Sequence, residues 1–427
     1  MFLFNIIAYS VIVIPYTLSY IRKFKLTPVS IFLIMQMTFF YGICFSELGR
    51  TATVLKLETL YVVANAMFIF GTVVSRVLRK KGSRTPLINT FTDKEDTDLQ
   101  RLILWVIAIV AVLVCAYLFI SSGVNVFVES LKSFASGTNE NMQDDRAEFR
   151  GVSGMGYIYQ FRVVLLPLIA TYFAMVSKKK YNKLITVPLI VLMIIFILGT
   201  GQRNAFVFYC LIVVMLVWHM HREYKINIMS KTQAIVLGGS ALLFLVVLTI
   251  SNGRVEEGND NIVVGALQSL YDRVFSVNQG SAITAFRYID SQETVWGYDW
   301  IQMLKQALPG ESDYLPVDNI AYYMDYGTYK GTNPPCLWGS AWYNFSYIGV
   351  TVFPFILGII YHNIYKNYVV RSDKGRAYVL IYVALCVYLG IWSYGTPMTL
   401  LNNGVITVLI LRWLLFSLFK KRTEVRK

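Results

Sequence analysis

The sequence has few of the residues from which metal centres and disulfide frameworks are built. Only three histidines occur in 427 residues, and we expect all of them at the ends of apolar segments. The five cysteines are scattered, and no two of them have C-x-x-C spacing. Isolated cysteines in apolar runs behave as small buried hydrophobes, so the pattern predicts neither a metal site nor disulfides. We therefore expect no metal and no other cofactor.

Charge is also scarce, and long apolar runs replace it. Charged residues make up 15% of the chain and hydrophobic residues 56%, against about 45–50% apolar residues in a soluble domain. Runs of about 18 or more apolar residues are typical of membrane-spanning helices. The sequence thus predicts an all-α, multi-pass membrane protein, one polytopic domain over residues 1–427. We expect about eleven spans: 2–20, 28–46, 57–76, 102–121, 157–177, 184–200, 204–219, 232–250, 341–361, 377–395 and 401–419.

The first of these runs differs from a secretory signal peptide. No basic stretch precedes Phe2, and no small-residue cleavage site follows Tyr20. Both features would be expected of a cleaved signal. The run is therefore predicted to be the first membrane span.

The net charge of +14 invites a nucleic-acid interpretation, which the distribution of charge argues against. Lysine and arginine concentrate in alternate connections between the predicted spans, among them 21–25, 76–101 and 366–376, and in the C-terminal tail. Cytoplasmic connections of membrane proteins carry this excess. The pattern predicts an outside N-terminus and a cytoplasmic C-terminus, with membrane lipids and not nucleic acid as the surroundings.

Two polar segments, 122–156 and 251–340, interrupt the apolar pattern on the predicted outer side. The second is rich in tryptophan and tyrosine, which argues against disorder. Connections longer than about 15 residues are usually functional or disordered. We therefore predict that residues 251–340 carry an active site, facing the periplasm or the cell exterior.

Arginines on that side are candidate ligands for an anion. Arg203 follows a glycine-flanked turn in ILGTGQRNAF and begins an apolar run, which suits an anionic headgroup because helix N-termini and guanidinium groups both bind phosphate. A cation snorkelling at a helix end explains it equally well. Arg254 directly follows a predicted span. Arg146 and Arg150 are four residues apart, although the acidic residues among them could equally neutralise them.

Arg273 and Arg287 lie fourteen residues apart in a segment of helical character. In one continuous helix they would be about 21 Å apart at a rise of 1.5 Å per residue. They could then not hold a single phosphate. Either residues 278–280 break the helix and bring the two arginines together, or the two serve different groups.

Carboxylates and aromatic side chains supply the remaining candidates. Asp272, Asp290 and Glu293 lie beside the arginines and could act as a general base, and no spacing singles out one of them. Tryptophan and tyrosine either form an interfacial belt or stack on sugar rings. The candidates for glycan contact are Trp296, Tyr298, Trp300, Asn333 and Trp338.

Three stretches, in chain order, are ILGTGQRNAF, YDRVFSVNQGSAITAFRYID and GTNPPCLWGSAWYNFSYIGV. Together they resemble the Wzy-type oligosaccharide repeat-unit polymerases that build O-antigen, enterobacterial common antigen and capsule. ILGTGQRNAF is similar to that family's small-residue turn followed by arginine. YDRVFSVNQGSAITAFRYID is similar to its outer-loop segment with an early arginine, and GTNPPCLWGSAWYNFSYIGV to its Thr/Ser-Pro stretch. The Arg-to-Gly spacings that some members show are absent, so Arg146 and Arg150 are additional candidates only.

The resemblance implies a GT-C-like glycosyltransferase in the cytoplasmic (inner) membrane. It would act in polysaccharide or lipopolysaccharide biosynthesis at the outer leaflet, with undecaprenyl-pyrophosphate-linked oligosaccharide as both donor and acceptor. Arg203 and Arg273 would bind the pyrophosphate, and Arg254 and Arg287 join them by position. The family also implies a chain-length regulator of the Wzz type as a partner. An O-antigen ligase, or a flippase or transporter of the same lipid-linked substrate, is the alternative.

Overall fold

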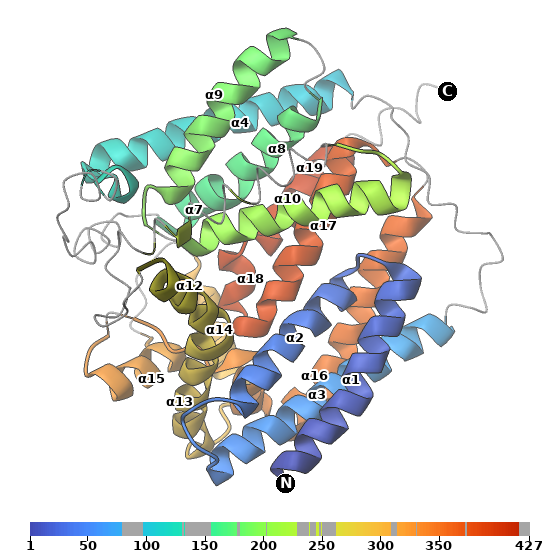
Figure 1. Cartoon of the computed structure of the whole chain (residues 1–427), viewed down its shortest axis with the longest axis vertical. Helices are drawn as coiled ribbons and strands as arrows, with labels where there is room; N and C mark the ends of the chain where they lie inside the picture. The colour runs from blue at the N-terminus through green and yellow to red at the C-terminus, as the bar shows by residue number, and fades with distance from the viewer. Residues whose placement is uncertain are drawn as a thin grey trace. The chain divides into compact units, whose positions relative to one another are not determined.

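A computed structural model describes residues 1–78, 97–129, 132, 155–176, 180–201, 203–228, 239, 245–246, 249, 262–308, 314–329, 331–371 and 374–417. The described residues form helices and connections, with no strand among them, so the predicted all-α fold is confirmed for that part of the chain. The helices (Figure 1) are α1 (Phe2–Phe24), α2 (Pro28–Cys44), α3 (Ala52–Leu78), α4 (Asp98–Ser122), α7 (Met155–Tyr159), η3 (Gln160–Leu165), α8 (Leu166–Val176), α9 (Lys180–Leu198), α10 (Arg203–Tyr224), α12 (Ile262–Asp272), η4 (Arg273–Val277), α13 (Asn278–Asp290), α14 (Tyr298–Gln306), α15 (Val317–Tyr326), α16 (Cys336–Val370), α17 (Arg376–Ile391), η5 (Trp392–Tyr394), α18 (Met398–Asn402) and α19 (Val405–Phe416).

Seven of the described helices are long and apolar enough to cross a membrane, which supports a multi-pass membrane protein. They correspond to the predicted spans at 2–20, 57–76, 102–121, 157–177, 204–219, 341–361 and 377–395. Three further predicted spans form shorter apolar helices, Pro28–Cys44, Leu184–Leu198 and Val405–Phe416. Most of the predicted span 232–250 lies outside the described residues. The total of eleven and the orientation stay predictions.

Contacts group the chain into two compact units. Unit 1 comprises residues 1–89, 271–371 and 386–401, and unit 2 comprises 90–270, 372–385 and 402–427. The boundaries show that each unit gathers segments that are distant in sequence. In particular, residues 271–340 of the long polar segment belong to the same unit as the first three helices.

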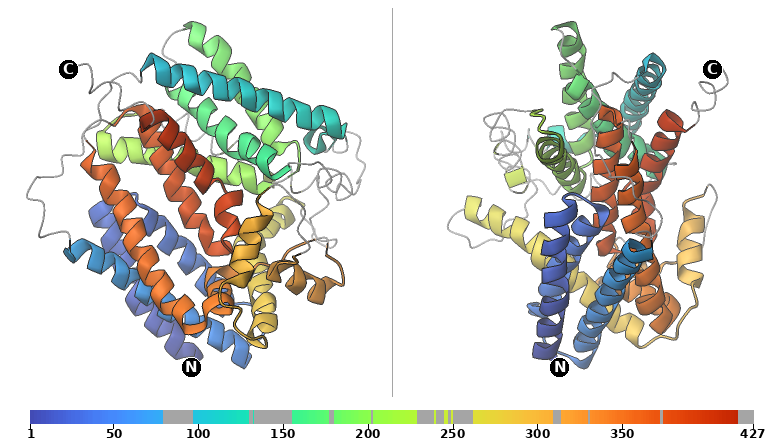
Figure 2. Two further views of the ribbon diagram at one scale, coloured as in Figure 1. Left: turned by 180° about the vertical axis from the view of Figure 1, so that it is seen from behind. Right: turned by 90° about the vertical axis from the view of Figure 1, so that its right-hand side faces the viewer.

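In unit 1, α16 packs along α3, and α1 and α2 pack beside them (Figures 1 and 2). Glycines allow the closest approach. A Cβ atom added to Gly71 of α3 would lie 2.0 Å from the carbonyl oxygen of Phe355, and one added to Gly358 of α16 would lie 2.1 Å from that of Phe68. Small residues at such crossings let membrane helices pack by van der Waals contact where lipid removes any hydrophobic driving force.

Local sequence explains where several helices begin and end. Thr27 accepts a hydrogen bond from the backbone nitrogen of Ser30, with Pro28 in the first turn of α2. Thr97 and Gln100 form the same reciprocal capping arrangement at the start of α4. Such caps satisfy backbone N–H groups that have no partner within the helix. α4 then ends at Gly123, whose positive φ of 69° suits glycine.

A sharp kink divides α16, although the sequence predicts one uninterrupted span over 341–361. Ser346 has φ 51° and ψ −133°, which is not helical. After the kink the chain folds back so closely that a Cβ on Gly349 would lie 2.0 Å from the carbonyl oxygen of Ala341. The ten-residue part before Ser346 is about 15 Å long, too short to cross a bilayer. Only the part after the kink has membrane-spanning length.

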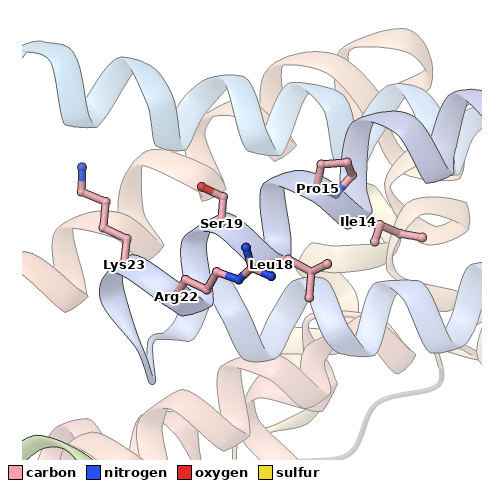
Figure 3. A pocket seen from close by; sticks show the side chains of 6 residues that line it. All are labelled: Ile14, Pro15, Leu18, Ser19, Arg22 and Lys23. Carbon is pink, nitrogen blue, oxygen red and sulfur yellow. The ribbon is translucent and has the colours of Figure 1, made fainter.

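One face of α1 carries a shallow hollow (Figure 3). Its lining comes entirely from this helix: Ile14, Pro15, Leu18, Ser19, Arg22 and Lys23. Four of these side chains are apolar or small, and the two cations lie together in the last turn. An exposed apolar stripe that ends in basic residues suits a lipid-facing helix. The hollow therefore fits the membrane surroundings better than it fits a reaction site.

The glycine contact between α3 and α16 predicts a large effect of one substitution. Gly71→Leu should destabilise the protein by about 1–3 kcal/mol, because the side chain has to displace the backbone at Phe355. Gly156→Leu is the control, since a Cβ there meets no atom within 4 Å. Melting temperatures of the purified proteins measure the difference. Equal melting temperatures of Gly71→Leu and wild type would show that the helices do not pack at this glycine.

Candidate functional site

The segment from α13 to the start of α16 in unit 1 contains the strongest candidate site. α13 packs against α2, α3, α15 and α16, and α14 packs against α16. From residue 271 on, the described part of the polar segment predicted to carry the active site is thus folded onto the helices of unit 1. Two carboxylates that the sequence analysis did not select, Asp299 and Asp318, are central to it.

Asp299 is fully buried in the first turn of α14. Its carboxylate accepts hydrogen bonds from the hydroxyl of Tyr314 at 2.7 Å, the backbone nitrogen of Val317 at 3.3 Å and the amide of Asn344 at 3.4 Å. Burial raises the pKa of Asp299, and these three hydrogen bonds oppose that rise. The carboxylate therefore joins α14, the connection before α15, and α16.

Asp318 lies in the first turn of α15, one residue after the nitrogen that Asp299 holds. Its buried Oδ1 has no hydrogen-bond partner among the described residues. Burial, and then the nearby Asp299 carboxylate, raise its pKa to about 6. A carboxyl group with a pKa close to neutrality is suited to give and take protons near pH 7. Perturbed carboxylates of this kind are enriched at functional sites.

The stretch Thr332–Pro335 is hydrogen-bonded to α15 through Asn333. The backbone nitrogen of Asn333 donates to the Asp318 carbonyl oxygen at 2.9 Å, and its side-chain amide donates to Asp325 at 3.0 Å. Asn333 is buried. The structure thus brings this predicted glycan ligand to the helix that carries Asp318, where its side-chain amide is engaged with a carboxylate.

Aromatic side chains are exposed around this segment. Trp296 is 68% and Tyr298 55% exposed, as a sugar-stacking role requires. Tyr323 and Tyr329 stack with ring centroids 4.3 Å apart, and both are exposed. We use the name aromatic surface for all five exposed rings, which are Trp296 and Tyr298 at the start of α14 and Tyr323, Tyr326 and Tyr329 at and just after the end of α15. The sequence analysis named only the first two.

Two other predicted glycan ligands are structural in this fold. Trp300 donates its indole N–H to Ser340 at 2.7 Å, and its ring packs against Phe345 and Phe353. Trp338 is fully buried and lies edge-on to Phe32. No part of the Trp338 ring is exposed for a sugar to stack on.

The predicted cations of unit 1 lie along one helix. α12, η4 and α13 follow each other without a break, so residues 278–280 do not fold Arg273 and Arg287 together. Asn278 and Gln279 instead bond back to the carbonyl oxygens of Arg273 and Val274. Both arginines are exposed, and Arg287 donates to the Leu48 carbonyl oxygen at 2.8 Å. The structure therefore excludes the alternative in which a break in the helix brings the two arginines together.

The three predicted bases differ from Asp318 in their surroundings. Asp290, the last residue of α13, pairs with Lys56 of α3, whose Nζ lies 4.5 Å over the Trp342 ring. Glu293 is exposed beyond α13, and Asp272 is half-buried at the end of α12. The structure does not bring these three together. In the sequence, Asp318 is an aspartate two residues after Pro316. Such an aspartate is equally typical of the first turn of an ordinary helix.

In unit 2, Arg162 forms hydrogen bonds to the residues at and before the glycine-flanked turn of the motif ILGTGQR. This fully buried arginine of η3 donates to the carbonyl oxygens of Phe196 and Ile197 at 3.2 and 2.9 Å and to the Thr200 hydroxyl at 2.6 Å. The carbonyl oxygens are those left free at the C-terminus of α9, where a cation is favoured. Arg162 was not among the predicted cation ligands.

The other predicted cations of this half are less defined. α10 begins at Arg203, as the motif predicts, but its side chain is outside what the structure describes. Arg146, Arg150 and Arg254 also lie outside the described residues.

Arg162 generates a stability prediction. Arg162→Met should cost about 1.5–3 kcal/mol, because carbonyl oxygens at the α9 C-terminus lose their charged donor in a buried place. Arg412→Met is a matched control, since Arg412 also lies in an apolar helix and contacts the Tyr378 ring, an interaction worth about 1 kcal/mol or less. Urea or thermal denaturation compares the two. A smaller loss for Arg162→Met than for Arg412→Met would contradict the capping role.

Asp318 generates a pH prediction. Its folded-state pKa of about 6 exceeds the ordinary aspartate value of about 3.9, so the folded protein holds a proton that the unfolded chain has released. Stability should therefore be full below about pH 4 and fall by about 2–3 kcal/mol as the pH rises to about 6. Asp318→Asn should lose this part of the pH dependence and be more stable than wild type at pH 7.

Melting temperatures between pH 4 and pH 8 test this expectation. Glu293→Gln removes an exposed carboxylate and should keep the wild-type profile. A wild-type profile in Asp318→Asn would show that the group does not carry a raised pKa.

The chain matches no protein-family model, no curated protein and no solved structure.

Proposed function

We propose that the protein is a membrane glycosyltransferase that polymerises oligosaccharide repeat units carried on undecaprenyl pyrophosphate into a surface polysaccharide such as O-antigen. The growing glycan leaves its lipid pyrophosphate and joins the non-reducing-end sugar of a new lipid-linked repeat. The proposal combines the resemblance of three sequence motifs with the chemistry of the site in unit 1.

The proposal depends on Asp318, whose pKa is raised to about 6 and whose Oδ1 has no hydrogen-bond partner among the described residues. Glycosyl transfer to a sugar hydroxyl needs a group that accepts the hydroxyl proton, and a carboxyl group of pKa about 6 is in its basic form at pH 7. Its unpartnered oxygen leaves a lone pair for that proton. Asp299 supports this role because its three hydrogen bonds fix the start of α15.

The reaction then takes place in one displacement step. The acceptor hydroxyl oxygen attacks the anomeric carbon of the donor, and its proton passes to the Asp318 carboxylate. The bond from the anomeric carbon to the pyrophosphate oxygen breaks, and the pyrophosphate leaves with the electron pair. Charge that develops on a leaving group is stabilised by fixed cations, and the exposed residues Arg273 and Arg287 are the candidates in unit 1. The resemblance adds Arg203 as a pyrophosphate ligand.

The aromatic surface accounts for the binding of the glycan. Rings of tyrosine and tryptophan present flat apolar faces together with a polar edge, which suits sugars that have both C–H faces and hydroxyl groups. Trp296 has φ 51°, a left-handed conformation that is uncommon outside glycine, and its ring remains exposed. Binding at this surface would leave the acceptor sugar on the same segment as Asp318.

A transporter of the same lipid-linked substrate is the second candidate. It is favoured by two fully buried ionisable residues within apolar helices, Arg162 and Glu58, because charges inside membrane helices commonly mark transport paths. Glu58 was not among the candidate residues predicted from the sequence. An O-antigen ligase would share the polymerase chemistry and differ in its acceptor.

Product analysis separates these candidates. Purified protein in lipid vesicles is incubated with a lipid-linked repeat unit, and the glycans are resolved by length. A polymerase gives a ladder of lengths; a transporter moves the substrate between leaflets without lengthening it. A ligase lengthens nothing unless a lipid A core acceptor is present.

The variants test the residue assignment. Asp318→Asn should reduce the rate of chain growth about 100-fold or more, the usual contribution of a general base, and Arg203→Ala and Arg273→Ala should each abolish the ladder. Glu293→Gln tests the competing base. A ladder kept in Asp318→Asn but lost in Glu293→Gln would overturn the role of Asp318 and leave the polymerase activity standing.

A further inference from the structure

A cluster of oxygen atoms between α1 and α3 is not used by the proposed reaction. The Asn5 side-chain amide nitrogen lies 3.3 Å from Oε2 of Glu58, 3.2 Å from the hydroxyl of Thr59 and 3.4 Å from the carbonyl oxygen of Leu55. Asn5 and Glu58 are buried, with exposures of 2% and 0%. One turn of α3 thus presents three oxygen ligands to one point on α1.

The cluster has more acceptors than donors. An amide nitrogen carries two hydrogens and here faces three oxygens, each at a long distance for a hydrogen bond. The Thr59 hydroxyl donates its hydrogen bond to the Leu55 carbonyl oxygen at 2.8 Å, so it is an acceptor toward Asn5. The second oxygen of Glu58, Oε1, has no hydrogen-bond partner at all among the described residues.

The Glu58 carboxylate also has no cation in direct contact. No lysine or arginine among the described residues forms an ion pair with it; Arg50 and the N-terminal amine act on it from a distance, and the Cys44 thiol donates a hydrogen bond to it. Arg50 is exposed and lies over the Phe2 ring. A carboxylate buried in this way is stable only if a cation joins it or a proton neutralises it.

We propose that Asn5, Leu55, Glu58 and Thr59 form a binding site for a monovalent cation, with Na⁺ as its ligand. Turning the Asn5 amide over by 180° exchanges its nitrogen for its oxygen without moving other atoms. The carboxylate, the hydroxyl, the backbone carbonyl and the amide oxygen then all face one point. One carboxylate among neutral oxygens matches a single positive charge, and hard cations prefer oxygen ligands of this kind.

The ion would enter from the water at one end of the helices. Asn5 is in the first turn of α1, and Glu58 is in the second turn of α3. Lys56, two residues before Glu58, has a side chain that is 40% exposed and pairs with Asp290 of α13. Bound Na⁺ would therefore link α1 to α3 next to the contact of α3 with α13. The proposal does not depend on the reaction that the protein catalyses.

Two measurements on the purified full-length protein at pH 8 test the site. The melting temperature is recorded in NaCl and in choline chloride at the same ionic strength, and retention of ²²Na⁺ is measured directly. Wild type should melt at a higher temperature in Na⁺, with a saturable dependence on concentration, and should retain about one ion per chain. Glu58→Gln should lose both effects and melt at one temperature in either salt.

Matched variants keep the test decisive. Thr59→Val removes one neutral ligand and should weaken Na⁺ binding about tenfold, which provides a readout even where Glu58→Gln fails to fold. Glu47→Gln removes an exposed carboxylate nearby and should behave as wild type. A wild type that melts at the same temperature in both salts and retains no ²²Na⁺ would overturn the proposal and identify Glu58 as a protonated carboxyl group.

Discussion

The burial of the Asp299 carboxylate is the constraint on which the candidate site depends. Removing a carboxylate from water is costly unless hydrogen bonds replace the water, and here three donors from three parts of unit 1 converge on it. That requirement fixes the connection before α15 and the first turn of the helix itself. Asp318 is consequently half-buried with its Oδ1 atom out of contact with water, and this burial and then the Asp299 carboxylate raise its pKa.

Two other buried charged groups, Arg162 and Glu58, also lose their contact with water, and they differ in what replaces it. Arg162 uses carbonyl oxygens at the C-terminus of α9, which carry the negative end of a helix dipole. Glu58 lies among oxygen atoms that cannot neutralise it, and we infer a bound cation there. The contrast follows from the backbone, because free helix carbonyls compensate a cation and not an anion.

The sequence predicted the helices well because apolar runs of membrane-spanning length leave few other folds possible. It did not predict the kink at Ser346, since neither proline nor glycine occupies that position. It also missed Glu58, because one glutamate in a long apolar run changes the mean hydropathy little.

The candidate site was only partly predictable, for reasons that particular residues illustrate. The exposed rings of Trp296 and Tyr298 agree with the pattern, but Trp338 belongs to the same aromatic segment and is fully buried. Composition cannot separate these outcomes, because burial depends on the packing of distant helices. Asp318 was missed because its raised pKa arises from burial and then from Asp299, nineteen positions earlier, and the fold, not a motif, brings about both.

The most direct test of this account is the titration of Asp318 itself. Carbon-13 resonances of labelled aspartate carboxyl groups, recorded in wild type and in Asp318→Asn between pH 3 and pH 9, identify the one signal that belongs to this residue. We expect this signal to titrate near pH 6. A signal that titrates near pH 4, the ordinary value for aspartate, would contradict the account, because Asp318 would then have no property that distinguishes it from the other carboxylates.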